Sequence, residues 1–222
     1  MPINQEKYKE IIAALGGKAT LVAVSKTKPA EDIQALYDLG QRDFGENYVQ
    51  ELVDKQSALP ADIRWHFIGH LQSNKVKYIA PFVHLIHGVD SFKLLKEIDK
   101  QAAKLSKVIQ VLLQVHIARE ETKFGMDEGE LADALRDAGQ LSHVCVRGLM
   151  GMASFSNDKN VVRGEFRRLH SLFEQYRRPA TPGCDWSIRS MGMSGDYTIA
   201  MEEGSTLVRI GSLLFGEREY KK

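Results

Sequence analysis

The segment "LVAVSKTKPAEDI" (residues 21–33) contains a short apolar run, a polar turn and the start of a helical pattern. An apolar run of this kind, bounded by turn residues, is typical of a strand that is buried on both faces. Lys26 and Lys28 follow the run directly, and Pro29 with the acidic pair behind it indicates that a helix begins there. A strand that passes at once into a helix is the first half of a βαβ unit.

The same alternation of apolar runs and amphipathic segments continues along the chain. Eight candidate strands are predicted, over residues 20–25, 42–46, 64–69, 83–89, 108–117, 143–151, 186–192 and 206–212. Strands that alternate with helices imply right-handed crossovers and a parallel sheet, and eight of them predict closure into a (β/α)8 TIM barrel. The segment up to Leu15 is predicted to form an extra N-terminal helix.

The fold class predicted is therefore α/β, with a single domain over residues 1–222 and no linker or repeat. The alternative is an open doubly wound sheet. That fold calls for a glycine-rich fingerprint after the first strand, and "VSKTKP" contains no glycine.

Composition excludes several classes of protein. Thirty Lys and Arg residues against 29 Asp and Glu give a net charge of +1, which does not favour nucleic acid or a membrane surface as a partner. The N-terminal residues are polar, unlike a signal peptide, and no apolar stretch reaches the roughly 20 residues that span a bilayer. Cys145 lies in an apolar run and is interpreted as a small buried hydrophobe, so neither it nor Cys184 is expected in a disulfide. A reducing, cytoplasmic compartment is predicted.

Polar residues collect where the predicted strands end, which is where barrel proteins place their chemistry. Two such ends are typical of anion sites. In "MGMSGDY" (residues 191–197) a glycine–serine turn with Ser194 leads into a short helix, and in "RIGS" (residues 209–212) Gly211 lets the backbone approach a ligand closely. The alternative is that these glycines only form tight turns, with Asp196 capping the helix.

Lys26 and Arg209 are the candidate reactive and charged groups beside these turns. Partial burial and nearby cations lower the pKa of a lysine amine, and the neutral amine attacks carbonyl groups and forms a Schiff base. Lys28 has the same strand parity, so spacing leaves both lysines open, although Pro29 favours Lys26 weakly. Arg209 stands among apolar residues of a buried strand, so it must face a ligand or pair with a carboxylate; the candidate partners are Glu202 and Glu217.

The histidines do not predict a metal site. His66 and His70 are four residues apart in an extended strand, about 13 Å, which is too far to share one ion. His84 and His87 fall on opposite strand faces. A colourless barrel that acts as a phosphosugar isomerase through Lys26 is a further alternative.

Five motifs resemble the pyridoxal-phosphate homeostasis protein family, also called the YggS/PROSC family, in the right order over most of the chain. These are "AVSKTKP", "FGENYVQE", "WHFIGHLQSNK", "SMGMSGDY" and "LVRIGSLLFGER". The resemblance implies a single (β/α)8 barrel similar to the barrel domain of alanine racemase, the barrel of fold type III PLP proteins. It also implies pyridoxal 5′-phosphate (PLP) as cofactor and a role in vitamin B6 balance.

The resemblance also assigns roles to individual residues. It makes Lys26 the lysine that holds PLP as a Schiff base and places Arg209 against the pyridine nitrogen. The other residues that it brings to the cofactor or its rim are Asn47 beside the ring, Ser194, Gly195, Gly211 and Ser212 at the phosphate, Met193 beside the cofactor, and His70, Asn74 and Lys75 at the mouth. "EETKFGM" matches more loosely, which leaves a role for Lys123 open.

The chemistry of these residues favours holding PLP over turnover. Arginine keeps its proton at neutral pH, so it would leave the ring nitrogen unprotonated and the cofactor a poor electron sink. Alanine racemase takes a second acid/base tyrosine from another domain, and because the sequence ends at Lys222 we expect no such domain here. The expected function is buffering or delivery of PLP, with PLP-dependent apoenzymes as partners. The alternative is a slow amino-acid racemase or decarboxylase.

Overall fold

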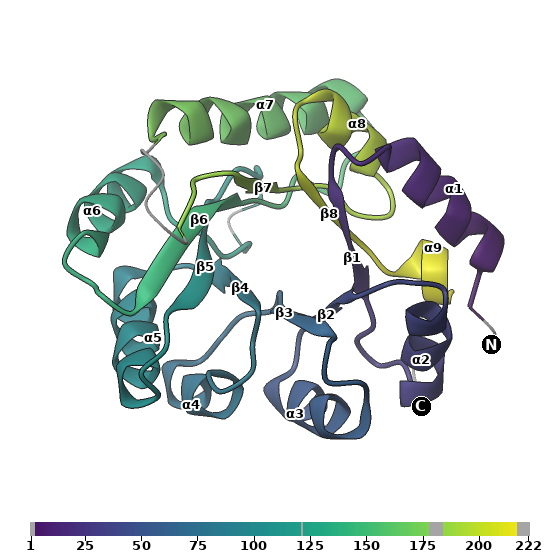
Figure 1. The fold of residues 1–222 in the computed structure, drawn as a ribbon. Helices are drawn as coiled ribbons and strands as arrows, with labels where there is room; N and C mark the ends of the chain where they lie inside the picture. The colour runs from purple at the N-terminus through teal and green to yellow at the C-terminus, as the bar shows by residue number, and fades with distance from the viewer. Residues whose placement is uncertain (1–2, 121, 178–183, 217–222) are drawn as a thin grey trace.

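A computed structural model describes residues 3–120, 122–177 and 184–216, which form a closed barrel of eight parallel strands (Figure 1). The strands are β1 (Thr20–Val24), β2 (Asp43–Glu46), β3 (Arg64–Phe67), β4 (Leu85–Val89), β5 (Ile109–Gln114), β6 (Val144–Met150), β7 (Ile188–Ser190) and β8 (Leu207–Ile210). Each strand pairs with its neighbours in the chain, and β8 closes the barrel by pairing with β1. The predicted barrel is confirmed, with strand ends displaced by a few residues.

Helices surround the barrel on its outer side (Figure 1). They are α1 (Gln5–Leu15), α2 (Ala30–Asp38), α3 (Val49–Ala58), α4 (Val76–Ile79) after the 3-10 turn η1 (Ser73–Lys75), α5 (Phe92–Lys104), α6 (Glu128–Ala138), α7 (Lys159–Gln175), α8 (Tyr197–Glu202) and α9 (Ser212–Phe215). The helix predicted before the barrel is α1. Its start is tied to α9, because the backbone N–H of Asn4 donates to the carbonyl of Leu214 at 2.8 Å.

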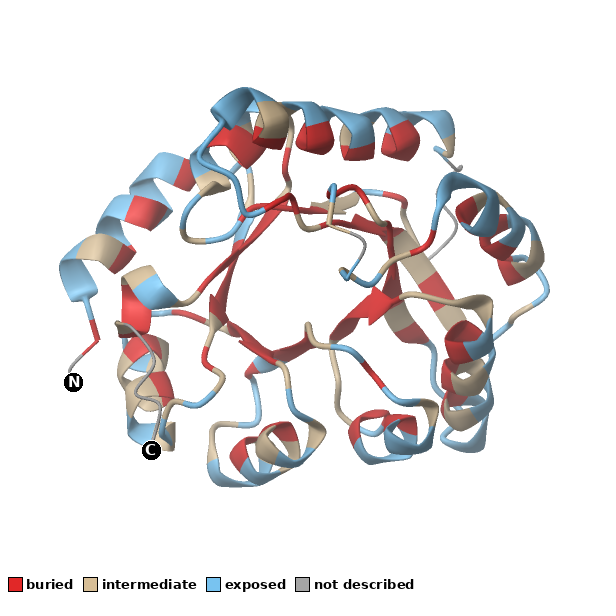
Figure 2. Cartoon of the chain, turned by 180° about the vertical axis from the view of Figure 1, so that it is seen from behind, coloured by how far each residue is buried: buried red, intermediate tan, exposed pale blue. Residues whose placement is uncertain are grey.

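Two hydrophobic clusters follow from the alternation of side chains along the strands. The larger one fills the space between strands and helices, and in Figure 2 the helices are buried mainly on the face toward the strands. The smaller one lies inside the barrel and consists of Val22, Leu85, Leu112, Met150 and Leu207. Residues two positions apart share a strand face, so His87 and Arg209 lie on the same face as Leu85 and Leu207. The barrel interior therefore contains buried polar groups beside a small apolar layer.

The prediction that the cysteines stay unpaired is wrong. Cys145 in β6 is bonded to Cys184, which lies just before β7, across a sequence separation of 39 residues with the Cα atoms 5.5 Å apart. Closure of the barrel places β6 beside β7 and brings the two residues together, and nothing in their sequence spacing indicates this. Cys145 is buried as expected. Among the helices that the structure describes, none is long and apolar enough to cross a membrane.

Candidate functional site

A pocket of about 420 Å³ opens where β1, β2, β7 and β8 end, a volume typical of small-molecule sites. Its lining contains eight of the eleven residues that the resemblance brings to the cofactor or its rim, namely Lys26, Asn47, Met193, Ser194, Gly195, Arg209, Gly211 and Ser212. Lys26 and both glycine turns therefore lie at the same end of the barrel. Lys28 also lines the pocket, so the geometry alone does not choose between the two lysines.

The turn that carries Lys26 is tightly folded. It begins directly after β1, and the backbone N–H of Lys28 donates to the carbonyl of Ser25 at 3.0 Å. Thr27 has a φ of 64°, in the left-handed region that residues other than glycine rarely adopt. Such a conformation persists only where surrounding contacts fix it.

Those contacts come from a buried ionic cluster of Glu46, Glu51 and Lys55. Lys55 Nζ donates to Glu46 Oε1 and Glu51 Oε1, both at 2.7 Å, and to the carbonyl of Ser25 at 2.8 Å. Glu46 Oε1 also accepts from Ser25 Oγ at 2.6 Å, and Glu51 Oε1 accepts from the backbone N–H of Thr27 at 2.5 Å. Ser25 and Thr27, the residues on either side of Lys26, are thus both hydrogen-bonded to this cluster.

Glu46 is the most confined member of this cluster. Its side chain is fully buried, and among the described residues its Oε2 atom has no hydrogen-bond partner. Burial raises the pKa of Glu46, although Lys55 and Ser25 act in the opposite direction. The motif "FGENYVQE" contains Glu46 and Glu51. Their joint contact with Lys55 could not be predicted from the motif, because it depends on how α3 packs against the end of β2.

The turn after β7 needs glycine at position 192. Gly192 has a φ of 96°, and a Cβ there would lie 2.6 Å from the Cβ of Ala200. The backbone N–H of Met193 donates to Asp196 Oδ1 at 2.6 Å, so the carboxylate closes this turn. It makes no capping hydrogen bond to α8.

The turn after β8 is packed against β1 and joined to the turn after β7. A Cβ at Gly211 would lie 3.1 Å from the carbonyl oxygen of Val24, and the Gly211 N–H donates to Ser194 Oγ at 3.3 Å. The backbone N–H groups of Ser194, Gly195 and Ser212 have no acceptor among the described residues. Neighbouring N–H groups of this kind form a concavity that suits an anion.

Arg209 is only 4% exposed and borders the same pocket. Its Nη1 donates to the carbonyl and Oγ of Ser190 at 2.8 and 2.5 Å, and its Nη2 donates to the carbonyl of Gly151 at 3.0 Å. Burial lowers the pKa of Arg209 to about 10, so it remains charged at neutral pH.

Glu202 pairs with Arg163 and not with Arg209, and Glu217 lies outside the described residues. In the described part of the chain Arg209 makes no ion pair with a carboxylate, and its three hydrogen bonds go to neutral oxygens. A buried cation in this position beside a pocket is suited to an anionic or electron-rich ligand.

His70 and Lys75 lie outside the first pocket. They line a neighbouring pocket of about 440 Å³ that shares Asn47 with it. His70 Nδ1 lies 3.0 Å from Asp90 Oδ2, and its ring stacks on Phe124.

Asn74 is exposed, and Lys123 donates to the carbonyl of Ala153 at 2.5 Å. Neither is among the residues that line the two pockets. Sequence reasoning missed the apolar lining of the first pocket. Its members are Val24, Ile68, Met152, Phe155 and Phe215, apolar residues that the sequence did not mark as ligand contacts.

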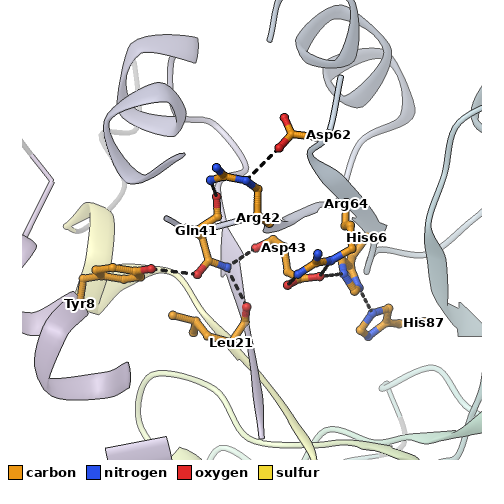
Figure 3. A network of polar contacts seen from close by, with 9 residues as sticks. All are labelled: Tyr8, Leu21, Gln41, Arg42, Asp43, Asp62, Arg64, His66 and His87. Atoms are coloured by element: carbon orange, nitrogen blue, oxygen red, sulfur yellow. Dashed lines mark hydrogen bonds and ion pairs between the residues drawn. The ribbon is translucent and has the colours of Figure 1, made fainter. Parts of the chain in front are cut away.

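Three potential metal ligands gather at the opposite end of the barrel. Within the described residues, single ligand atoms of Asp43, His66 and His84 lie within 4.8 Å of one another. The sequence comparison of histidines along single strands did not find this set, because it spans neighbouring strands. Arg64 donates to Asp43 Oδ1 at 2.8 Å and to Oδ2 at 2.5 Å, and the Nε2 atom of His66 lies 2.9 Å from Oδ1 (Figure 3). Both carboxylate oxygens are thus engaged by the guanidinium of Arg64, and we assign no metal here.

Comparisons with known proteins agree with this geometry. The sequence matches the family model described as alanine racemase, N-terminal domain, over residues 4–219. A pyridoxal phosphate homeostasis protein of Pasteurella multocida is 42% identical over 207 residues, covering 91% of this chain and 88% of the relative. The Homo sapiens protein of the same name is 40% identical, covering 91% of this chain and 78% of the relative.

Solved structures show the same likeness. PipY of Synechococcus elongatus PCC7942 with PLP bound has a TM-score of 0.86 at 36% identity, covering 95% of this chain and 99% of PipY. Alanine racemase from Bartonella henselae has a TM-score of 0.72 at 16% identity, covering 96% of this chain and 60% of the racemase. The second likeness concerns the fold alone.

Proposed function

The chain belongs to the pyridoxal phosphate homeostasis protein family, and on that premise we propose that it binds PLP as a Schiff base on Lys26 and takes part in PLP homeostasis. The observation that carries the proposal is the convergence on one pocket of Lys26, the two glycine turns and buried Arg209. An aldehyde, an anionic phosphate and a ring nitrogen are the groups of PLP that these features fit.

The available polar atoms match PLP group by group. The N–H groups of Ser194, Gly195 and Ser212, which find no acceptor in the described part of the chain, would hold the phosphate together with the hydroxyl of Ser194. Arg209 would donate to the pyridine nitrogen. Asn47 Oδ1 is buried without a partner among the described residues and borders the pocket, where it would lie beside the ring.

Bound PLP supplies an aldehyde that condenses reversibly with an amine, forming a C=N bond and releasing water. Lys26 provides that amine from a turn fixed by Glu46, Glu51 and Lys55. Arg209 stays charged and would donate a hydrogen bond to the ring nitrogen without giving up its proton, which would leave that nitrogen unprotonated and the ring a weak electron sink. This arrangement favours retention of the cofactor over rapid turnover.

The finer role that we propose is buffering of PLP and its delivery to PLP-dependent apoenzymes in the cytoplasm. The test is a transfer assay with a PLP-dependent apoenzyme at matched total PLP. The loaded protein should keep free PLP low and still activate the apoenzyme. Failure to activate would contradict delivery, and sustained deuterium exchange at Cα across an amino-acid panel would favour a slow racemase instead.

Ser194→Ala is expected to weaken PLP binding by about 1–3 kcal/mol, or roughly 5- to 150-fold, because it removes a hydroxyl from a charged phosphate. Equilibrium dialysis measures the dissociation constant. Ser57→Ala is the matched control, because Ser57 is exposed on α3 and its hydroxyl donates only to the carbonyl of Asp54. Equal affinities of the two variants would remove Ser194 from the phosphate site.

Arg209→Met is expected to weaken PLP binding roughly tenfold or more, since a hydrogen bond from a charged donor is lost. Arg209→Lys keeps the charge but not the planar fork and should recover only part of the affinity. Retention of PLP on dialysis reports the effect, and thermal unfolding of each variant separates it from loss of fold. Unchanged retention in Arg209→Met would argue against a contact with the ring.

A further inference from the structure

A chain of hydrogen bonds crosses the barrel interior from Arg209 to Asp43. Arg209 Nη1 donates to Ser190 Oγ at 2.5 Å, and Ser190 Oγ lies 3.0 Å from His87 Nδ1. His87 Nε2 lies 2.9 Å from His66 Nδ1, and His66 Nε2 lies 2.9 Å from Asp43 Oδ1. Figure 3 shows the Asp43 end of this chain, where the rings of His66 and His87 point toward one another.

With Asp43 ionised and His66 neutral, every hydrogen bond in the chain has one direction. An ionised carboxylate can only accept, so His66 must donate from Nε2, and a neutral His66 then accepts at Nδ1. His87 must therefore donate from Nε2 and accept at Nδ1 from the hydroxyl of Ser190. At the other end Arg209 can only donate, so Ser190 Oγ accepts from it. With His66 neutral, both histidines therefore carry their proton on Nε2.

The pKa shifts of His87 and Asp43 support this assignment. Burial, with smaller effects from His66 and Arg209, holds the pKa of His87 well below its usual range. For Asp43, burial acts to raise the pKa, but hydrogen bonds from Arg64 and His66 outweigh it and keep the carboxyl ionised. A negative charge at one end and a positive charge at the other polarise the neutral groups between them.

The Asp43 end is itself rigidly held (Figure 3). Arg64 contacts both carboxylate oxygens, and Gln41 Nε2 donates to the backbone carbonyl of Asp43 at 2.6 Å. Tyr8 of α1 donates to Gln41 Oε1 at 3.4 Å, so the helix before the barrel contributes to the same support.

We propose that Asp43 is a positioning residue for Arg209, acting through His66, His87 and Ser190. The relay supplies the buried guanidinium with a polarised acceptor in place of a direct carboxylate partner and so holds it at the pocket. Where this concerns the affinity for PLP, it rests on the proposed function.

Two substitutions at His66 separate the relay from simple packing. The amide of His66→Gln can accept from His87 through its oxygen and donate to Asp43 through its nitrogen, which preserves the direction of the chain. His66→Phe keeps an aromatic ring of similar size but breaks the chain. Packing alone predicts that Phe is tolerated better, and the relay predicts that Gln is. His84→Phe is the matched control, because His84 lies against His66 at 5.4 Å between ring centroids but outside the relay.

The first readout is the tautomer of His87, measured by NMR on ¹⁵N-histidine-labelled protein without PLP. We expect neutral Nε2–H in the wild type, in His66→Gln and in His84→Phe, and a changed tautomer ratio in His66→Phe. A wild-type His87 protonated at Nδ1, or one unaffected by His66→Phe, would overturn the relay. This measurement stands even if the protein does not bind PLP.

The second readout is the dissociation constant for PLP. We expect His66→Phe to bind PLP roughly 2- to 30-fold more weakly than the wild type, which is the usual size of an effect transmitted through such a network. The affinity of His66→Gln should stay close to that of the wild type. A changed His87 tautomer without any change in PLP affinity would overturn the positioning role of Asp43. Asp43→Asn should weaken binding in the same direction as His66→Phe.

Discussion

Lys26→Ala is expected to abolish covalent retention of PLP, because the methyl group that replaces the amine cannot condense with an aldehyde. The visible absorption band of the PLP-loaded protein should disappear, and borohydride should no longer fix the cofactor to the chain. The barrel should remain folded, since Lys26 lies in the turn after β1 and not in the core. Absorbance before and after reduction, with the intact mass of the protein, measures the effect.

The control for this variant is Lys28→Ala. Lys28 belongs to the same turn and lines the same pocket, so its removal changes the local charge by the same amount. Lys28→Ala should keep the visible absorption band and the PLP adduct that borohydride reduces. Its affinity for PLP can fall, because a positive charge near the phosphate is lost. An adduct that survives Lys26→Ala and disappears in Lys28→Ala would exchange the roles of the two lysines.

Lys55→Met is expected to lower the free energy of unfolding by about 3–5 kcal/mol, because it leaves a buried carboxylate without its counter-ion. Glu46 is fully buried and Lys55 only 9% exposed, so little solvent is present to compensate. The carbonyl of Ser25 also loses its donor, which should loosen the turn of Lys26 and weaken PLP binding. Urea denaturation gives the stability, and dialysis gives the binding.

The pH dependence of Lys55→Met follows from the raised pKa of Glu46. Burial already raises this pKa above the ordinary value of 4.5, and the loss of Lys55 raises it further. A carboxyl with a higher pKa in the folded state stabilises the fold below its unfolded pKa, and this stability is lost as pH rises through the folded pKa. The variant should therefore be closest to the wild type near pH 4.5 and least stable in alkaline buffer. Glu46→Gln in the same background should flatten this dependence; a pH-independent deficit in Lys55→Met alone would contradict it.

The fold could be predicted from the sequence because each strand is a short apolar run that can be recognised from its own residues. The run at residues 20–25 and its seven counterparts are apolar, short and separated by helical patterns, and a parallel sheet follows from that order. The disulfide could not be predicted in this way. Cys145 and Cys184 meet only because neighbouring strands of a closed barrel bring residues 39 positions apart into contact.

The candidate site could be predicted in part, for the same reason. Lys26, Ser194 and Gly211 follow strand ends, and all strand ends of one polarity meet at one end of a barrel. His70 also follows a strand end, but its side chain turns toward Asp90 and Phe124, a direction that strand parity does not determine. Buried polar groups that hold the site residues in place are even harder to predict from the sequence.

The relay from Asp43 to Arg209 and the cluster around Lys55 are examples. Their members come from different strands and helices and look like isolated polar residues in the sequence. His66 and His87 are 21 positions apart yet their ring nitrogens are 2.9 Å apart, because β3 and β4 are adjacent. Contacts of this kind exist only after the barrel has closed.

Peptide mapping of the borohydride-reduced, PLP-loaded wild-type protein tests the central claim most directly. A stable secondary amine should appear at one position, on the peptide that contains Lys26, with trypsin cleavage blocked after that residue. Modification concentrated instead on Lys28, Lys75 or another lysine, with Lys26 unmodified and cleaved normally, would contradict the assignment of the pocket's reactive amine.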